Sequence, residues 1–396
     1  MACLVIGWGV MGRGEKGACR GFSALPPNLA VLELTAEVFS MASSEATSNQ
    51  RLRIIDASLN RIGEGLRLLE DVARLLLNDV VLSQELKNMR HELVTSGLAF
   101  NRELLQSRDV EGDVGIDIET PEQAEPRELP IMVVANARRV QEALRTLEEL
   151  AKLPDATAKL DSEKFKKARF NLYTIERALV SRLLRKDKVG GIRGLYVIID
   201  TQMLKGRSHM GVAGQVIGGG ARVIQLRDKL QGKKELLPVA RELKKLCSEH
   251  NVLFIMNDYL DLALASDADG LHLGQKDLPI KAARKLLPLD KILGCSTTTV
   301  DQAVTAESEG ADYVAAGSVY PTSSKEAAVV VGLERLRQIR QAVSLPLVAI
   351  GGITRDNVAE VLAAGADSAA VISDILGAES PEEAARQIAD KFEAQK

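Results

Sequence analysis

The sequence predicts an α/β fold, a (β/α)8 TIM barrel preceded by an all-α, internally duplicated helical domain. Two observations predict it. Residues 191–396 hold eight short apolar runs that alternate with segments of helical period, and residues 49–190 are almost entirely helical in period and repeat themselves. Buried parallel strands read as continuous apolar runs, and eight strand–helix units in succession are typical of a closed barrel.

In residues 1–48 the apolar residues follow neither the spacing of a helix nor that of a strand for long. We expect these residues to form a poorly ordered extension. They include Gly7-Trp-Gly9-Val-Met-Gly12, which has the spacing of a dinucleotide-binding fingerprint. A working fingerprint opens a helix inside a βαβ unit. Three further glycines would break that helix and no second strand follows, so we predict no coenzyme site here.

The helical domain, residues 49–190, contains an internal repeat. Residues 57–75 align with residues 135–153, 78 positions later, and nine of the nineteen aligned positions are identical. The segments that follow, 83–108 and 162–186, share a helical period and basic ends. The pattern predicts a duplicated helical hairpin that forms a four-helix bundle.

Two interpretations of the polar face of the first repeat stay open. One is a solvated stripe of charged side chains paired along the helix. The other is a polar site near the pseudo-twofold axis, assembled from both repeats. The stripe consists of Asn60, Glu64, Arg67 and Asp71, and the second interpretation places Arg108, Asp109 and residues 112–115 nearby. No Walker phosphate loop is present in the sequence.

The barrel, residues 191–396, is predicted from eight strands, each followed by a polar cluster. In such barrels function collects on the loops after the strands, so one face should hold the chemistry. The predicted strands are residues 195–200, 222–226, 252–256, 270–273, 292–295, 313–316, 346–350 and 369–372.

Gln225, Arg227 and Lys229 follow the second strand and alternate with Leu226 and Asp228. Because side chains alternate along a strand, the first three can all face the barrel mouth. Two cations and an amide suit a diphosphate and a ring. An ordinary solvated loop is the alternative.

Asn257 and Asp258 follow the third strand, and Asp277 follows the fourth. The two carboxylates could hold one Mg²⁺ whose coordination the diphosphate and water complete. Helix capping by Asp is the alternative interpretation. We expect His272 to be a buried, hydrogen-bonded imidazole rather than a metal ligand.

The loops after strands six to eight form a second predicted anion site. Residues 321–325 offer three hydroxyls and a cation, Gly351 and Gly352 follow strand seven, and Ser373 follows strand eight. Barrels often bind a phosphate with the loops after strands seven and eight. Two anion sites, one with a metal, are what a transfer between two phosphorylated substrates needs.

Composition favours a protein that acts on or binds small molecules. The 396 residues are 46% apolar and 27% charged, as in ordinary globular proteins, and their length suits two or more domains. The net charge of −3 and the 3% aromatic content give no field or stacking surface for nucleic acid. The same charge gives no attraction to an anionic membrane.

Cysteine usage indicates a reducing compartment, and we expect the cytoplasm. Cys3, Cys19, Cys247 and Cys295 match neither a disulfide framework nor a zinc pattern. Apolar runs never approach the roughly 20 residues of a membrane span. The first residues lack the pattern of a signal peptide.

The barrel sequence resembles thiamine phosphate synthase over residues 191–396. The resemblance is carried by seven motifs in order: Gln225-x-Arg227-x-Lys229, Asn257-Asp258, Gly274-Gln275-x-Asp277, Gly294-x-Ser296-Thr297, Pro321-Thr322-x-Ser324-Lys325, Ala349-Ile350-Gly351-Gly352-Ile353 and Ile372-Ser373. It implies the condensation of 4-amino-2-methyl-5-(diphosphooxymethyl)pyrimidine with a thiazole phosphate, which gives thiamine phosphate and diphosphate.

The resemblance also implies site residues. The pyrimidine diphosphate would be held by Gln225, Leu226, Arg227, Asp228, Lys229, Asn257, Ser296 and Lys325, of which Arg227, Lys229 and Lys325 would act in catalysis. Mg²⁺ would be bound by Asp258 and Asp277, and the thiazole phosphate by Thr322, Ser323, Ser324, Gly352, Ile372 and Ser373. Ser324 stands where the family's threonine is expected, and it keeps the hydroxyl.

The helical domain is similar to an N-terminal domain that is fused to thiamine phosphate synthases and proposed to phosphorylate hydroxymethylpyrimidine phosphate. This resemblance is carried by residues 56–61, 64–67, 69–73 and 113–115. It implies ATP as a further substrate. A homo-oligomer is also compatible with the sequence.

Two competing functions remain for the barrel. A thiazole tautomerase-like enzyme of the same superfamily should not need the Gln225, Arg227 and Lys229 cluster with two carboxylates. A non-catalytic sensor of thiamine precursors, with the helical domain as a scaffold, should lose the carboxylate pair. The chain retains both sets.

Overall fold

The structure, a computed structural model, describes residues 29–94, 98–109, 128–153, 160–322 and 329–394. The chain divides into two compact units, residues 1–57 with 97–116 and residues 58–96 with 117–396. The boundaries we expected at residues 48 and 190 stay predictions.

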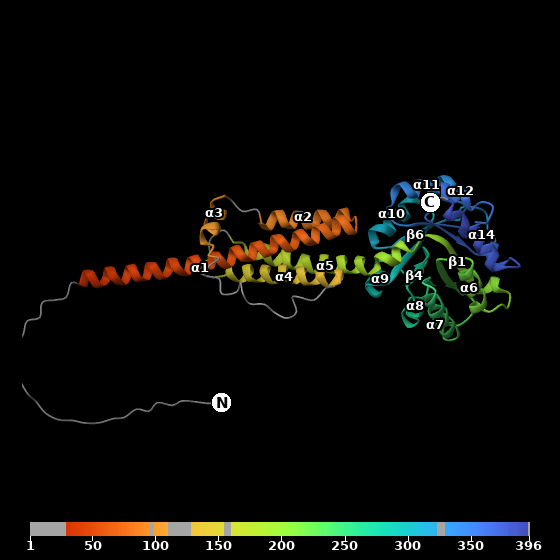
Figure 1. The fold of residues 1–396 in the computed structure, drawn as a ribbon, viewed down its shortest axis with the longest axis horizontal. Helices are drawn as coiled ribbons and strands as arrows, with labels where there is room; N and C mark the ends of the chain where they lie inside the picture. Colours follow the sequence, from red (N-terminus) through yellow and green to blue (C-terminus); the bar gives the residue numbers. More distant parts are fainter. Residues whose placement is uncertain (1–28, 95–97, 110–127, 154–159, 323–328, 395–396) are drawn as a thin grey trace, which may run out of the picture. The chain divides into compact units, whose positions relative to one another are not determined.

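Eight parallel strands close into a barrel in chain order, and β1 pairs with β8 to complete it (Figure 1). All eight predicted strands are confirmed: two have the predicted bounds, and the ends of the other six differ by one or two residues. The strands are β1 Gly194–Asp200, β2 Val223–Arg227, β3 Leu253–Asn257, β4 Gly270–Leu273, β5 Ile292–Thr297, β6 Tyr313–Ala316, β7 Leu347–Ile350 and β8 Ser368–Val371.

Helices alternate with the strands and surround them. Some begin at a residue whose side chain caps the helix, as Ser208 and Thr299 do for α6 and α10. The elements are η3 Thr201–Leu204, α6 His209–Gly218, α7 Lys233–Glu249, α8 Leu260–Ala265, α9 Ile280–Leu286, α10 Val300–Glu309, α11 Gly332–Ala342, α12 Val358–Ala363, α13 Ser373–Leu376 and α14 Pro381–Glu393. The predicted TIM barrel is therefore confirmed.

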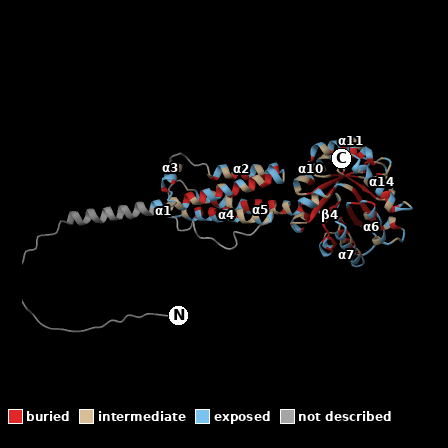
Figure 2. Cartoon of the chain, viewed as in Figure 1, coloured by how far each residue is buried: buried red, intermediate tan, exposed pale blue. Residues whose placement is uncertain are grey.

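Two apolar clusters fill the barrel domain, and the alternation of strand side chains separates them. Val197, Ile224 and Leu226 belong to the cluster between the strands and the helices. Tyr196 and Ile255 belong to a smaller cluster inside the barrel. Figure 2 shows the strands buried and the helices exposed on their outer sides. The residue parity of each strand thus decides which side chains reach the barrel interior.

The N-terminal region is all-helical in its described residues, which confirms that part of the predicted fold class. Its elements are α1 Leu29–Asp71, the π-turn η1 Val72–Leu76, α2 Val80–Val94, α3 Leu98–Ser107, α4 Leu129–Leu150 and α5 Ser162–Gly190. α4 and α5 lie side by side (Figure 1). No helix in these described residues is long and apolar enough to cross a membrane.

Helix α1 begins at Leu29, whereas we expected no regular structure up to residue 48. Residues 29–48 have no clear amphipathic period, and our expectation rested on period. They do contain many Ala, Leu and Glu residues and no Pro or Gly. Such residues have high intrinsic helix propensity, which explains the difference.

The C-terminal part of α5 contacts the amino ends of strands β5 and β6. Arg185 and Arg284 both bond to the carboxylate of Asp312, with N–O distances of 2.9 and 3.0 Å. Asp312 is 7% exposed and Arg185 6% exposed. Because removing one partner of a buried charge pair leaves the other unpaired, this cluster ties α5 to the barrel.

We expect Gly294→Ala to destabilise the barrel. A Cβ at position 294 would lie 2.0 Å from Cζ of the fully buried Tyr313 ring. Overpacking of this kind costs about 1–3 kcal/mol. Urea denaturation of the full chain measures the change in the free energy of unfolding.

Gly214→Ala is the matched control, since Gly214 lies in α6 and a Cβ there meets nothing within 4 Å. In a helix this change should stabilise by about 0.5–1 kcal/mol. A Gly294→Ala chain as stable as the Gly214→Ala chain would show that Tyr313 can move aside.

Candidate functional site

The end of β2 brings Gln225 and Arg227 to the barrel interior, on the same face of the strand as Val223. Gln225 is 2% exposed, and its amide donates to the Tyr196 hydroxyl at 2.7 Å. Arg227 is part-exposed and forms an ion pair with Asp200 at the end of β1. The predicted placement of these two side chains at the mouth therefore agrees with the fold.

Leu226 and Asp228 point elsewhere. Leu226 is fully buried in the cluster between strands and helices, so only its backbone can face the interior. Asp228 accepts hydrogen bonds from the N–H groups of Leu230 and Gln231 at 2.7 and 2.9 Å. Burial alone would raise the pKa of Asp228, but the neighbouring Thr201 hydroxyl, these two bonds and His209 outweigh it and lower the pKa. Asp228 thus organises the β2–α7 loop.

Asp258 and Asp277 lie side by side after β3 and β4. Asp258 adopts a left-handed backbone with φ 61°, and it forms an ion pair with Lys229. Asp277 accepts a hydrogen bond from the Gly274 N–H at 2.7 Å. Burial and the neighbouring Asp258 carboxylate raise the pKa of Asp277, against the lowering effect of that hydrogen bond. The structure brings both predicted metal ligands together.

Few side chains near Asp258 and Asp277 could bind a metal ion. Within the described residues no group of three or more His, Cys, Asp or Glu side chains is arranged to hold a metal ion. Two carboxylates that repel one another leave negative charge that a divalent cation neutralises. The pair therefore fits a cation whose remaining ligands come from a bound phosphate and water.

A hydrogen-bond network crosses the barrel interior below this cluster. The Tyr196 and Tyr313 hydroxyls are 3.1 Å apart, and Tyr313 reaches His272 Nδ1 at 3.0 Å. His272 Nε2 lies 2.9 Å from the Ser296 hydroxyl. Burial raises the pKa of both tyrosines, so their hydroxyls stay protonated. The network joins the predicted site residues Gln225 and Ser296.

His272 is 5% exposed with both ring nitrogens bonded, as expected from the sequence. The contributions of Tyr196, Tyr313 and Asp200 were not predicted. Tyr196 and Tyr313 occur inside apolar runs, where an aromatic residue reads as core. Asp200 ends the first run, and this polar ending was the signal that could have singled it out.

The loops after β6, β7 and β8 supply the second predicted site. A Cβ on Gly352, whose φ is 66°, would lie 2.5 Å from the Pro321 carbonyl oxygen. The backbone after β7 therefore runs directly against the segment that leads to Thr322. Ile372 is part-buried at the end of β8, and Ser373 is exposed at the start of α13. Ser323, Ser324 and Lys325 lie outside the described residues.

In the helical region, part of the predicted polar stripe is paired. Arg67 forms ion pairs with Glu70 and Asp71 at 3.9 and 3.5 Å. Arg108 bonds to Asp56, and Asp109 bonds to Arg53. These contacts agree with the solvated-stripe interpretation for Arg67 and Asp71. Residues 112–115 lie outside the described residues.

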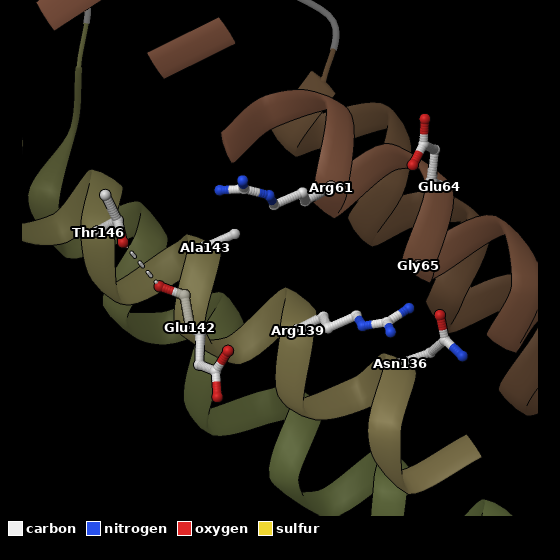
Figure 3. A pocket seen from close by; sticks show the side chains of 8 residues that line it. All are labelled: Arg61, Glu64, Gly65, Asn136, Arg139, Glu142, Ala143 and Thr146. Carbon is white, nitrogen blue, oxygen red and sulfur yellow. Dashed lines mark hydrogen bonds between the residues drawn. The ribbon is translucent and has the colours of Figure 1, made fainter. Parts of the chain in front are cut away.

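A pocket of about 520 Å³ opens between α1 and α4 (Figure 3). Glu64 of the predicted stripe lines this pocket. Arg61 and Arg139 also line it, and we did not select them from the sequence. Its lining residues are Arg61, Glu64, Gly65, Asn136, Arg139, Glu142, Ala143 and Thr146. Both repeats contribute, as the second interpretation of the polar face supposed.

Known families match both regions of the chain. The family described as thiamine monophosphate synthase matches residues 195–375, and the ThiD2 family matches residues 53–178. The two matches do not overlap. They fall on the barrel and on the helical region that precedes it.

Similar proteins span one or both regions. A thiamine-phosphate synthase of Thermosynechococcus vestitus is 37% identical over 346 residues, 87% of this chain and 95% of its own. One from Methanospirillum hungatei is 49% identical over 198 residues, 50% of this chain and 96% of its own. A solved thiamine phosphate pyrophosphorylase from Pyrococcus furiosus, 40% identical with a TM-score of 0.49, covers 52% of this chain and 98% of its own.

We expect Tyr313→Phe to destabilise the barrel, because it removes the hydroxyl that joins Tyr196 to His272. A buried polar group left short of a partner costs about 1–3 kcal/mol. The free energy of unfolding in urea measures this effect. Tyr173→Phe is the control. Tyr173 is 44% exposed, so the loss of its hydroxyl should lower the free energy of unfolding by less than about 0.5 kcal/mol. Equal effects would mean that the buried network carries little energy.

Proposed function

The chain belongs to the thiamine-phosphate synthase family, and we propose that the side chains at the carboxyl ends of its barrel strands carry out this family's reaction. The enzyme is a diphosphate-releasing transferase of thiamine biosynthesis. It joins a pyrimidine diphosphate to a thiazole phosphate and forms thiamine phosphate. The observation that carries the proposed site is the gathering of Arg227, Lys229, Asp258 and Asp277 beside the buried network.

The pyrimidine ring binds over the network in this proposal. Gln225 uses its amide N–H for Tyr196, so its Oε1 atom is held in place to accept from the ring's amino group. Ser296, oriented by His272, and Asn257 at the end of β3 supply further polar contacts. Arg227 and Lys229 then face the diphosphate. Their present partners, Asp200 and Asp258, hold both cations at the mouth.

Mg²⁺ is held by Asp258 and Asp277 in this proposal. The mutual repulsion of the two carboxylates, together with the carboxylate and phosphate oxygens that Mg²⁺ prefers, supports this choice. An ion held there would supply positive charge against the charge that develops on the departing diphosphate. Lys229 would exchange its contact with Asp258 for one with the diphosphate.

The thiazole phosphate binds to the opposite loops. Thr322, Ser323 and Ser324 offer hydroxyls, and Gly352 and Ser373 offer backbone N–H groups. The close packing of Gly352 against Pro321 supports a single phosphate site built from two loops. Ile372, part-buried at the end of β8, would contact the thiazole ring.

The chemical step needs no general base. The bond between the pyrimidine methylene carbon and the diphosphate oxygen breaks, and its electron pair leaves with the diphosphate. Arg227, Lys229 and Lys325 stabilise that charge, while the electron-rich aminopyrimidine stabilises the carbon cation. The thiazole nitrogen, which carries no proton, then forms the new carbon–nitrogen bond. Hydroxyls and cations, rather than an activated His or Cys, are therefore what the site requires.

The helical domain, in our proposal, makes the barrel's substrate. Its ThiD2 match lies outside the barrel, and the resemblance in residues 56–73 implies a pyrimidine phosphate kinase. A phosphate oxygen of hydroxymethylpyrimidine phosphate would attack the γ-phosphorus of ATP. The bond from that phosphorus to the β–γ bridging oxygen would break, giving the diphosphate and ADP.

Scattered buried thiols such as Cys247 and Cys295 support a cytoplasmic location for both steps.

Asp258→Asn should lower thiamine phosphate formation by about 100-fold or more, which corresponds to several kcal/mol of lost charge stabilisation. Asn tolerates the left-handed backbone at this position, so the change removes charge without strain. Initial rates over a Mg²⁺ titration measure the effect.

Asp261→Asn is its control, because Asp261 is exposed and pairs with Lys233. This variant should keep the rate and the Mg²⁺ dependence of the parent chain. Unchanged Mg²⁺ dependence in Asp258→Asn would refute the metal assignment.

The full chain, incubated with ATP, Mg²⁺ and hydroxymethylpyrimidine phosphate, should form ADP, and addition of thiazole phosphate should then give thiamine phosphate. Chromatography of both products tests the helical domain's proposed role. The control omits the pyrimidine. Absence of pyrimidine-dependent ADP would favour a scaffolding or oligomerisation role for this domain.

A further inference from the structure

The pocket between α1 and α4 is built from equivalent positions of the two sequence repeats. Because the repeats are offset by 78 residues, Arg61 corresponds to Arg139 and Glu64 to Glu142. Gly65 corresponds to Ala143 in the same way. Six of the pocket's eight lining residues therefore form three equivalent pairs, which places the pocket on the pseudo-twofold axis that relates the two helices.

Small residues bring the two helices together under the pocket. A Cβ on Gly65 would lie 2.4 Å from Val140 Cγ2 and 3.4 Å from the Asn136 carbonyl oxygen. The helices thus approach so closely that a larger residue does not fit. The long side chains of Arg61, Glu64, Arg139 and Glu142 extend around this crossing and enclose the pocket. Its volume of about 520 Å³ suits one small ligand.

The arginines of the pocket differ from the other equivalent pair of arginines in the repeats. Within the described residues, the side chains of Arg61 and Arg139 make no hydrogen bond or ion pair. Arg67 pairs with acidic neighbours, and its equivalent Arg145 pairs with Glu148 and Glu149 at 2.9 and 2.6 Å. Two guanidinium groups that have no partner among the described residues thus line a shared cavity.

The carboxylates of the pocket are separated from each other. In Figure 3 the Glu64 and Glu142 carboxylates lie at two opposite corners of the pocket, and the guanidinium groups of Arg61 and Arg139 lie at the other two corners. Such a pocket suits a ligand that carries both an anionic group and a hydrogen-bond donor. An anion without a hydrogen-bond donor would bind to the arginines but would leave both carboxylates without a donor from the ligand.

We propose that this pocket binds the phosphate ester of an amino-substituted heteroaromatic base, with Arg61 and Arg139 on its phosphate oxygens. Arginine matches phosphate through paired N–H donors. Glu64 or Glu142 accepts from the ring's amino group. The choice of ligand rests on the proposed kinase role, since both ATP and hydroxymethylpyrimidine phosphate carry this chemistry.

The test compares two double variants of the full chain that remove equal charge. Arg61→Gln with Arg139→Gln changes the pocket, and Arg67→Gln with Arg145→Gln changes the paired arginines. Calorimetric titration with ADP and, separately, with hydroxymethylpyrimidine phosphate measures affinity. The barrel contributes equally in both variants because its residues are unchanged.

The pocket variant should bind at least one of the two ligands about tenfold more weakly or worse, as expected for lost charge-assisted hydrogen bonds, and the control should bind as the parent does. The affected ligand identifies the source of the phosphate. Formation of thiamine phosphate from the preformed diphosphate should stay unchanged in both, which verifies folding. Equal weakening in both variants, or binding unchanged in the pocket variant, overturns the proposal.

Formation of ADP in the same chains separates this proposal from the kinase role. If the parent chain forms ADP and the pocket variant forms it equally fast, the pocket assignment is wrong and the kinase role stands. If the parent binds a ligand through Arg61 and Arg139 but forms no ADP, the kinase role is wrong and the pocket is a binding site.

Discussion

Tyr196 and Tyr313 meet inside the barrel with their hydroxyls 3.1 Å apart, and the buried hydrogen-bond network depends on this contact. Tyr196 holds Gln225 from one side, and Tyr313 holds His272 from the other. The network requires that strands β1, β2, β4 and β6 present interior side chains within hydrogen-bonding reach of one another. Gly294, which leaves room for the Tyr313 ring, is a part of the same constraint. The buried network thus fixes the side chains beneath the ring-binding position that we propose.

Strand parity explains how much of the site could be predicted from the sequence. The apolar runs and their polar endings were enough to predict eight strands and the interior positions of Gln225 and Arg227. The Leu226 side chain packs against the helices. The spacing of apolar residues alone cannot show whether such a side chain packs there or contacts a ligand. Nor can it show that Asp228 binds its own loop, because capping by Asp and ligand binding by Asp look alike in sequence.

Partners far apart along the chain were beyond sequence reasoning. Asp200 and Arg227 become neighbours only through the pairing of β1 with β2. Similarly, Asp258 and Asp277 could be predicted as two strand-end carboxylates, but their repulsion depends on a shared environment. In the helical region a wheel drawn for one repeat selected Glu64. It could not select Arg61 and Arg139, which face a common space only when two helices cross.

The repeat of residues 57–75 in residues 135–153 has a further chemical consequence. An exact twofold site would bind both ends of a ligand alike, yet the proposed ligands are asymmetric. Asn136 and Thr146 line the pocket from α4, whereas their equivalents on α1 are Ser58, which is buried, and the apolar Leu68. Polar atoms beyond the symmetric arginine and glutamate pairs therefore come mainly from α4. The phosphate can lie near the axis between the arginines, while the base, with its several ring donors and acceptors, is better satisfied on the α4 side.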